Sequence, residues 1–122
     1  MFELAADRYR QLFGAIRAGK CGRDLADVLS GQPAEAGYKS LSFITGWSTY
    51  NSRPVLFTKR IEPADWEFEL RPNYCLNVAG WIVSEDERMG VWVGDTVAVT
   101  DDGVRRLHRS PVDQLEANIL AD

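Results

Sequence analysis

The spacing of apolar residues divides the chain into a helical N-terminal part and a longer part that favours strands. Apolar residues of the first part recur at helical spacing, with charged residues on the opposite face: Leu4, Ala5, Tyr9, Leu12, Phe13 and Ile16. Gly19 follows at a place where a helix commonly ends. A second, shorter helix is predicted over residues 24–29, with Gly31 after it. Each helix is expected to bury one face in the core.

Beyond residue 39, short apolar and alternating segments predict strands. They cover residues 40–47, 55–58, 66–70, 74–83, 90–100 and 104–108, and a closing helix is predicted over residues 111–120. Residues 84–89 read as a polar turn, and Asp101-Asp102-Gly103 predicts a hairpin because glycine can adopt positive φ. Two helices followed by a run of antiparallel strands predict one α+β domain over residues 1–122.

Composition excludes several classes of function. The net charge is −4 and basic residues form no long cluster, so nucleic-acid binding is not expected. No apolar run approaches the ~20 residues of a membrane span, and the N-terminus has no apolar signal core. The cysteines lie far apart and the chain has one His, which argues against a Cys/His zinc site. We therefore expect a cytoplasmic protein that binds neither nucleic acid nor membrane.

Three motifs connect the chain to a known family. Residues 90–103 read G-V-W-V-G-D-T-V-A-V-T-D-D-G, and residues 70–80 read L-R-P-N-Y-C-L-N-V-A-G. Upstream, Ile44-Thr45-Gly46 precedes Pro54. With these motifs in this order, the chain from about Tyr9 to Pro111 resembles the second half of the pita-bread fold family of methionine aminopeptidase, prolidase, aminopeptidase P and creatinase. The resemblance implies a half pita-bread domain, in which two N-terminal helices pack on a curved antiparallel sheet.

The resemblance also implies a site that has lost its metal ligands. The family's second half supplies one His and two Glu, and those positions are Thr45, Ala79 and Gly94 in this chain. Shifting the weakest motif would place Trp47 at the His position instead. We therefore expect no metal, no other cofactor and no metallopeptidase activity. The only histidine, His108, is expected on the last strand, at the surface and away from these motifs.

Alternation along the strands places aromatic residues beside the three replaced positions. The expected ligand-binding residues are Phe43, Thr45, Trp47, Cys75, Ala79, Trp81, Trp92 and Gly94. Replacing an imidazole and two carboxylates by Thr, Ala and Gly opens volume and removes charge, so this face suits an apolar or planar ligand. The alternative, in which the tryptophans fill the space as core, stays open.

Three polar residues are candidates for orienting such a ligand or reacting with it. Asn77 is expected on the pocket face of its strand, Tyr50 can act as a weak acid or hydrogen-bond donor, and Arg53 can hold a carboxylate through two parallel hydrogen bonds. Each also has a purely structural interpretation: a strand-pairing amide, an exposed loop ring and a solvated loop cation.

Two functions of different class follow. In the first, the protein binds a small apolar metabolite without metal, and an enzymatic form would cyclise, isomerise or eliminate on it by positioning. In the second, it is a non-catalytic pseudoenzyme subunit or interaction module that pairs with another chain. A homodimer is expected, because a lone half of this fold leaves sheet surface and strand edges in water.

Overall fold

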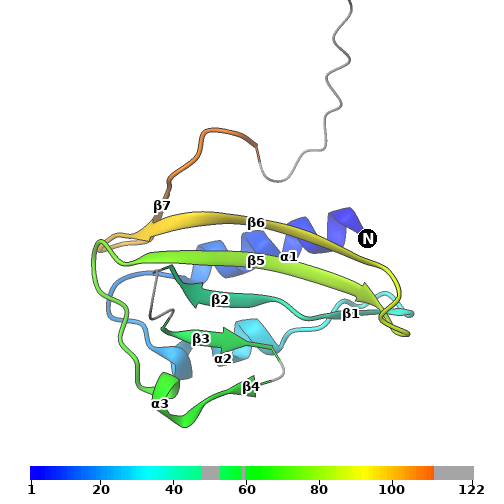
Figure 1. The fold of residues 1–122 in the computed structure, drawn as a ribbon, viewed down its shortest axis with the longest axis horizontal. Coiled ribbons are helices and arrows are strands. Elements are labelled where there is room, and N and C mark those ends of the chain that lie inside the picture. The colour runs from blue at the N-terminus through cyan, green and yellow to red at the C-terminus, as the bar shows by residue number, and fades with distance from the viewer. Residues whose placement is uncertain (48–52, 59, 112–122) are drawn as a thin grey trace, which may run out of the picture.

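The computed structural model describes residues 1–47, 53–58 and 60–111, and it contains one antiparallel sheet with helices on one face (Figure 1). The helices are α1 (Phe2–Ala15), α2 (Gly22–Ser30) and the short α3 (Pro63–Trp66). The strands are β1 (Tyr38–Ser40), β2 (Phe43–Gly46), β3 (Val55–Phe57), β4 (Arg60–Ile61), β5 (Cys75–Ser84), β6 (Gly90–Val99) and β7 (Val104–Arg106). The α+β prediction is therefore confirmed.

The sheet runs in the order β4-β3-β2-β5-β6-β7, and β1 also pairs with β5. Its two longest strands, β5 and β6, pair over nine residue positions, from Cys75↔Ala98 to Val83↔Gly90. Side chains alternate between the two faces of each strand. Ile44, Val78 and Val97 belong to one face and are fully buried against the helices. Phe43, Thr45 and their cross-strand partners therefore belong to the other face.

Helix α1 lies directly on the middle of the sheet, behind β5 and β6 in the view of Figure 1. Its buried side chains include Ala5, Tyr9 and Leu12, which agrees with the predicted helical spacing. Gly80 permits this close approach. A Cβ there would lie 2.1 Å from the carbonyl oxygen of Ala5 and 2.5 Å from the amide nitrogen of Tyr9. The core therefore lies between the helices and one face of the sheet, and the opposite face carries no helix among the described residues.

Helix α2 is fixed at its start by a side chain of its own first turn. The backbone N–H of Cys21 donates to the Asp24 carboxylate at 3.0 Å. This hydrogen bond, with a second one from the Cys21 thiol, lowers the pKa of the Asp24 carboxyl. The helix then packs against β3 and α1, burying Leu25 and Leu29.

The predicted first strand, residues 40–47, is split into β1 and β2 by a buried polar break. The Ser42 hydroxyl oxygen accepts a hydrogen bond from the backbone N–H of Trp81 at 3.1 Å and lies 2.7 Å from the Ser40 hydroxyl. Both serines are buried. The Ser42 hydroxyl therefore satisfies a buried backbone N–H that a regular strand ladder would bond to a backbone carbonyl. The strand patterning recognised the extended segment but not this interruption.

The predicted strand over residues 66–70 is wrong. Pro63 opens α3, as proline favours the first turn of a helix, and the helix ends at Trp66. Glu69 forms only an isolated bridge with Cys21. The hairpin at residues 101–103 is confirmed, since Thr100 N–H donates to the Gly103 oxygen at 2.9 Å. Gly103 does not adopt positive φ, however, so the stated reason for that turn is wrong. The predicted helix over residues 111–120 lies almost wholly outside the described residues.

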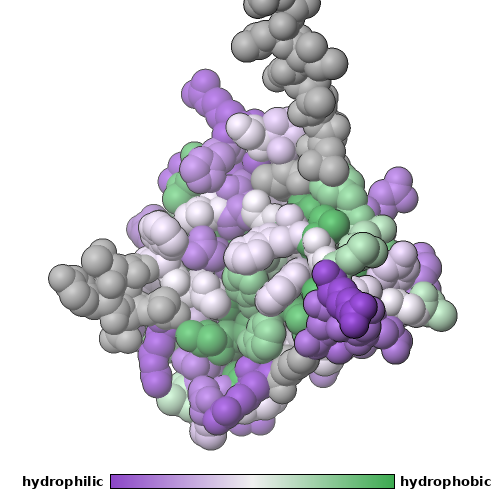
Figure 2. Space-filling view, turned by 45° about the vertical axis from the view of Figure 1, so that its right-hand side comes forward, coloured by the Kyte–Doolittle hydropathy of each residue, from purple (hydrophilic) through white to green (hydrophobic). Residues whose placement is uncertain are grey.

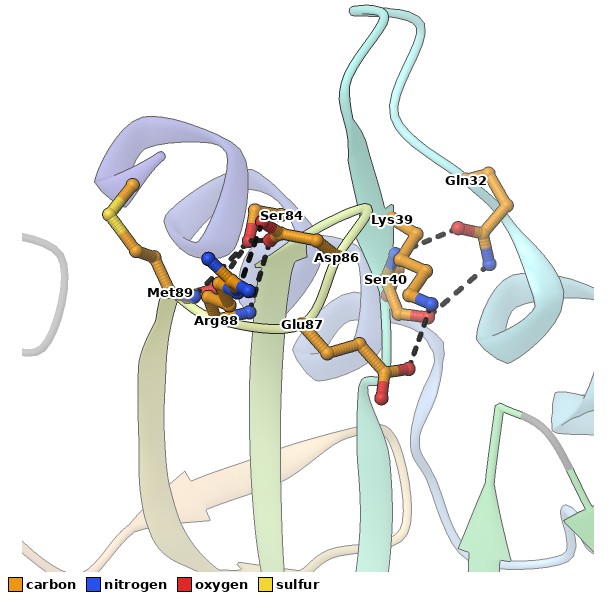
Figure 3. Close-up of polar contacts among 8 residues, drawn as sticks. All are labelled: Gln32, Lys39, Ser40, Ser84, Asp86, Glu87, Arg88 and Met89. Atoms are coloured by element: carbon orange, nitrogen blue, oxygen red, sulfur yellow. Dashed lines mark hydrogen bonds and ion pairs between the residues drawn. The ribbon is translucent and has the colours of Figure 1, made fainter.

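Figure 3 shows how the polar turn between β5 and β6 is held together. The Ser84 hydroxyl donates to the Asp86 carboxylate at 2.6 Å, and the backbone N–H of Arg88 donates to the same oxygen at 3.1 Å. These hydrogen bonds lower the pKa of Asp86. Lys39 on β1 pairs with Glu87 of the turn at 2.8 Å. The turn fixes the β5–β6 register on which the candidate site depends.

No described helix has both the length and the apolar character needed to cross a membrane.

Candidate functional site

A groove of about 590 Å³ crosses the helix-free face of the sheet, over β2, β5 and β6. Its lining consists of Phe43, Thr45, Trp47, Asn77, Val78, Ala79, Trp92, Gly94, Asp95, Thr96 and His108. In Figure 2, apolar and weakly polar side chains gather over the middle of the visible face, with strongly polar ones around them. A second hollow of about 340 Å³ continues from Phe43 and Thr45 toward β3 and β4.

Strand register brings the predicted residues together. Ala79 on β5 pairs with Gly94 on β6 and with Phe43 on β2. Two residues along, Asn77 pairs with Thr96 and with Thr45. The three positions that the resemblance assigned to lost metal ligands are therefore neighbours on adjacent strands. Ala79 and Gly94 give this part of the groove a floor of small side chains.

Trp92 lies over this floor. Its indole nitrogen is 2.8 Å from the position that a Cβ of Gly94 would occupy, so only a residue without a side chain leaves room for the ring. The Phe43 ring meets Trp92 edge-on, with centroids 5.0 Å apart and planes at 86°. This T-shaped geometry is a favoured arrangement of aromatic pairs. The glycine at position 94 therefore makes room for the indole of Trp92.

The tryptophans of this face do not fill the core. Trp92 is 60% exposed and Trp47 is 65% exposed, so both leave a large part of their rings in water. Trp81 lies beside Trp92, with ring centroids 6.0 Å apart, but it does not line the groove. Exposed aromatic surface around a hollow is typical of a place where another molecule binds.

The polar residues of the groove lie along β5 and β6. The Thr96 hydroxyl donates to the side-chain oxygen of Asn77 at 3.0 Å, which is the strand-pairing amide considered above. The Asp95 side chain is only 3% exposed and accepts hydrogen bonds from Arg106 Nε at 2.6 Å and from the backbone N–H of Thr96 at 2.8 Å. His108 Nε2 lies 3.9 Å from the Asp95 carboxylate.

His108 is exposed, as expected, but the expectation that it lies away from the site is wrong, because it lines the groove. It also lies beyond β7, which ends at Arg106. Val97 pairs with Arg106, so continuing the register by two residues places position 108 beside Asp95. The register does not place the His108 side chain at the groove, because positions 95 and 97 belong to the helix-covered face of β6. The sequence therefore held no signal that marked His108 as a groove residue.

Other predicted site residues lie outside the groove. Cys75 belongs to the same face of β5 but pairs with Ala98, two residues beyond Asn77, and does not line the groove. Arg53 approaches the buried Asp65 instead, with 3.9 Å between Nη1 and the carboxylate oxygen. Tyr50 lies outside the described residues.

The residues at the family's metal positions do not fit a divalent ion. Ala79 and Gly94 offer no ligand atom, and a side chain at position 94 would meet the Val78 carbonyl oxygen at 2.6 Å as well as Trp92. Across the described residues, no three His, Cys, Asp or Glu side chains form a group that could hold a metal.

Comparison with known proteins identifies the fold. Methionine aminopeptidase from Thermotoga maritima superposes with a TM-score of 0.60 and 14% identity, over 85% of this chain and 49% of that one. X-Pro aminopeptidase from Thermotoga maritima MSB8 superposes with a TM-score of 0.64 and 14% identity, over 91% of this chain and 31% of that one. No family model matches the sequence, and no curated protein matches it.

The fold is that of one half of a pita-bread protein, which confirms the resemblance drawn from the motifs. The chain spans about half the length of the aminopeptidase of the first comparison and about a third of the second. At 14% identity the likeness defines the fold alone, so function has to be argued from the groove.

Proposed function

We propose that the protein binds a small, planar, apolar metabolite in the Trp-lined groove, without a metal ion. The observation that carries the proposal is the exposure of Trp47 and Trp92 around a floor made of Ala79 and Gly94. The volume of about 590 Å³ falls within the range of small-molecule sites, which is roughly 300–1,000 Å³.

The binding energy would come mainly from the aromatic rings. An exposed Trp presents on the order of 100 Å² of apolar surface, and burying that area contributes about 2.5 kcal/mol at ~25 cal/mol per Å². A planar ligand lying against Trp92 and Phe43 uses this surface with little loss of side-chain freedom, because the two rings already hold each other in a T-shaped pair. Asn77 and Thr96 are placed to orient polar atoms of the ligand.

A reaction in this groove would depend on positioning. Among the described residues, the lining holds no cysteine, no serine and no pair of carboxylates, and the Asp95 carboxylate accepts a hydrogen bond from Arg106. Cyclisation, isomerisation or elimination of a reactive metabolite is the kind of step that shape and a few polar groups can favour. The proposed catalysis therefore requires that the proposed binding occurs.

Binding can be tested with 2-naphthamide, a neutral planar probe, by calorimetric titration. Trp92→Ala should lose most of the affinity and remain folded, because the ring is 60% exposed in the free protein. The matched control is Trp66→Ala. Trp66 lies on α3 and contacts the Arg23 guanidinium, 5.3 Å from its ring centroid, away from the groove. Equal loss of affinity in both variants would contradict the assignment of the site.

A non-catalytic interaction module is the second candidate. It is favoured by three large apolar side chains left in water: Trp47 at 65%, Met89 at 63% and Trp92 at 60% exposure. Such residues commonly anchor protein interfaces. In that case the same face would be covered by a second chain, and Trp92→Ala would change the oligomeric state rather than the affinity for a small probe.

A further inference from the structure

We propose that the hollow beside the groove is a second subsite, which takes an alkyl tail carried by the planar ligand. The proposal rests on the function proposed above and adds the chemical class of the ligand, a planar head with an apolar tail. It is carried by the continuity of the two spaces, because Phe43 and Thr45 line both the groove and the hollow. A ligand bound over Ala79 and Gly94 can therefore extend across β2 toward β3 and β4.

Strand register assembles the hollow on the helix-free face of the sheet. Phe43 on β2 pairs with Phe57 on β3, and two residues along, Thr45 pairs with Val55. Leu56, between the two β3 positions, is fully buried on the helix side. Because side chains alternate along a strand, Val55 and Phe57 belong to the same face as the groove residues. Neighbouring strands lie about 4.8 Å apart, so a tail of a few carbons is long enough to pass from β2 onto β3.

The hollow is mainly apolar along its length and has a paired set of charges at its far end. Val55 is 41% exposed, so much of a branched apolar side chain lies in water. The far end is formed by Arg60 and Glu62, where Arg60 Nε lies 2.9 Å from the Glu62 carboxylate. The two charges offset each other, so this pair does not favour a charged tail over a neutral one. Covering the apolar surface with an alkyl tail is favourable because it removes that surface from water.

The opposite end of the groove is polar, which determines the direction in which the tail points. There the Thr96 hydroxyl donates to Asn77, and Arg106 donates to the Asp95 carboxylate. An alkyl tail at that end would displace water from polar side chains without offering them a hydrogen bond. The ligand therefore places its head over the floor of the groove and its tail in the hollow.

The test compares three probes by calorimetric titration of the whole chain: N-methyl-, N-butyl- and N-(2-methoxyethyl)-2-naphthamide. The methoxyethyl tail has the length of the butyl tail, with an oxygen in place of one CH₂ group. A fully buried CH₂ group raises affinity up to about fourfold, and an open hollow covers about half of a tail, so the butyl probe should bind roughly eightfold more tightly than the methyl probe. The methoxyethyl probe should gain at most about twofold, because its oxygen would lose hydrogen bonds to water.

Two substitutions of Val55 locate the tail. Val55→Asp places a carboxylate in the hollow and should reduce the butyl gain to less than about twofold. The gain is a ratio of two affinities of the same variant, so it does not depend on how tightly that variant holds the naphthalene ring. Val55→Thr keeps the branched shape that suits a strand and replaces a methyl group by a hydroxyl. It should lower the gain to roughly threefold, and it decides the outcome if the aspartate variant does not fold.

Met89→Asp is the matched control. It makes the same change of charge at a side chain that is 63% exposed in the turn between β5 and β6, outside both spaces, and should keep the wild-type gain. An equal loss of the gain in this control would overturn the proposal, because the effect would not be local to the hollow.

The remaining outcomes separate this proposal from the function on which it rests. If the methyl probe binds but the butyl probe binds no more tightly, the groove is a ligand site and the hollow is not its subsite. A butyl gain that persists in both Val55 variants places the tail elsewhere, and a methoxyethyl probe as tight as the butyl probe contradicts an apolar subsite. If wild-type protein binds neither 2-naphthamide nor its N-methyl form, the proposed function itself fails and takes this proposal with it.

Discussion

Gly94 offers a direct test of how the groove is built. A Cβ at this position would lie 2.6 Å from the Val78 carbonyl oxygen, 2.8 Å from the Trp92 indole nitrogen and 3.0 Å from the Ala79 Cβ. Contacts below 3.0 Å force something to move, and the nearest atom belongs to the backbone of a paired strand. Even the single methyl group of Gly94→Ala should therefore disturb both the β5–β6 ladder and the indole above it.

The expected cost is a difference of two effects. Overpacking of a filled site costs about 1–3 kcal/mol. Replacing glycine by alanine also reduces the conformational freedom of the unfolded chain, which stabilises the folded protein by about 0.4–1 kcal/mol. Gly94→Ala should therefore lower the free energy of unfolding by about 1–2 kcal/mol, or the melting temperature by ~4–8 °C in a domain of this size. Urea denaturation followed by circular dichroism measures this change, and Trp92 fluorescence should change with it.

Gly14→Ala is the control for that substitution. Gly14 lies in the last turn of α1, with no atom within 4 Å of the added Cβ, so alanine should stabilise the helix by about 0.5–1 kcal/mol. The two variants make the same chemical change and should shift stability in opposite directions. If Gly94→Ala were as stable as wild type, with unchanged tryptophan fluorescence, the packing of Trp92 over Gly94 would be wrong.

Three further predictions follow. Adding Mn²⁺, Co²⁺ or Zn²⁺ to chelator-treated protein should leave the melting temperature unchanged, because the resemblance assigns the family's ligand positions to Thr45, Ala79 and Gly94, which offer no imidazole or carboxylate. Stoichiometric bound metal would contradict this. Light scattering should give twice the chain mass of 13.7 kDa, and a monomer mass that does not change with concentration would rule out the homodimer. Because the pKa of Asp24 is lowered in the folded protein, its ionised carboxylate stabilises the fold at pH values above the unfolded-state pKa, near 3.8. This stabilisation is lost as the pH falls through the lower, folded-state pKa. Asp24→Asn should therefore weaken the acid dependence of the urea midpoint below pH about 4, and an unchanged profile would count against the helix-start hydrogen bond.

The fold was predictable where the pattern is long. β5 and β6 each span ten residues. The range predicted for β5, 74–83, is shifted by one residue from the observed strand, and the range predicted for β6, 90–100, is one residue too long. The strand predicted over residues 66–70 was wrong because its apolar residues, Trp66, Phe68 and Leu70, alternate over only five positions. An alternation this short occurs in irregular segments as well as in strands. Pro63 was the stronger signal there, since it favours the first turn of a helix.

The site was only partly predictable. Alternation along β2, β5 and β6 is a local property, so the sequence could place Phe43, Asn77 and Gly94 on one face. The position of His108 depends on where β7 stops pairing with β6, which is a tertiary property that residue types do not specify. Whether Trp92 would be buried or exposed was likewise undecided, because it depends on what covers that face of the sheet.

The most direct test of the central claim uses the indole N–H signals of the tryptophans in nitrogen-15 NMR spectra. Trp47 and Trp92 line the groove, Trp81 lies beside it, and Trp66 is elsewhere on α3. Titration with 2-naphthamide should shift the Trp92 and Trp47 signals in a saturable way and leave the Trp66 signal in place. If the groove signals stay fixed, or if Trp66 shifts as much as Trp92, the Trp-lined groove is not the binding site.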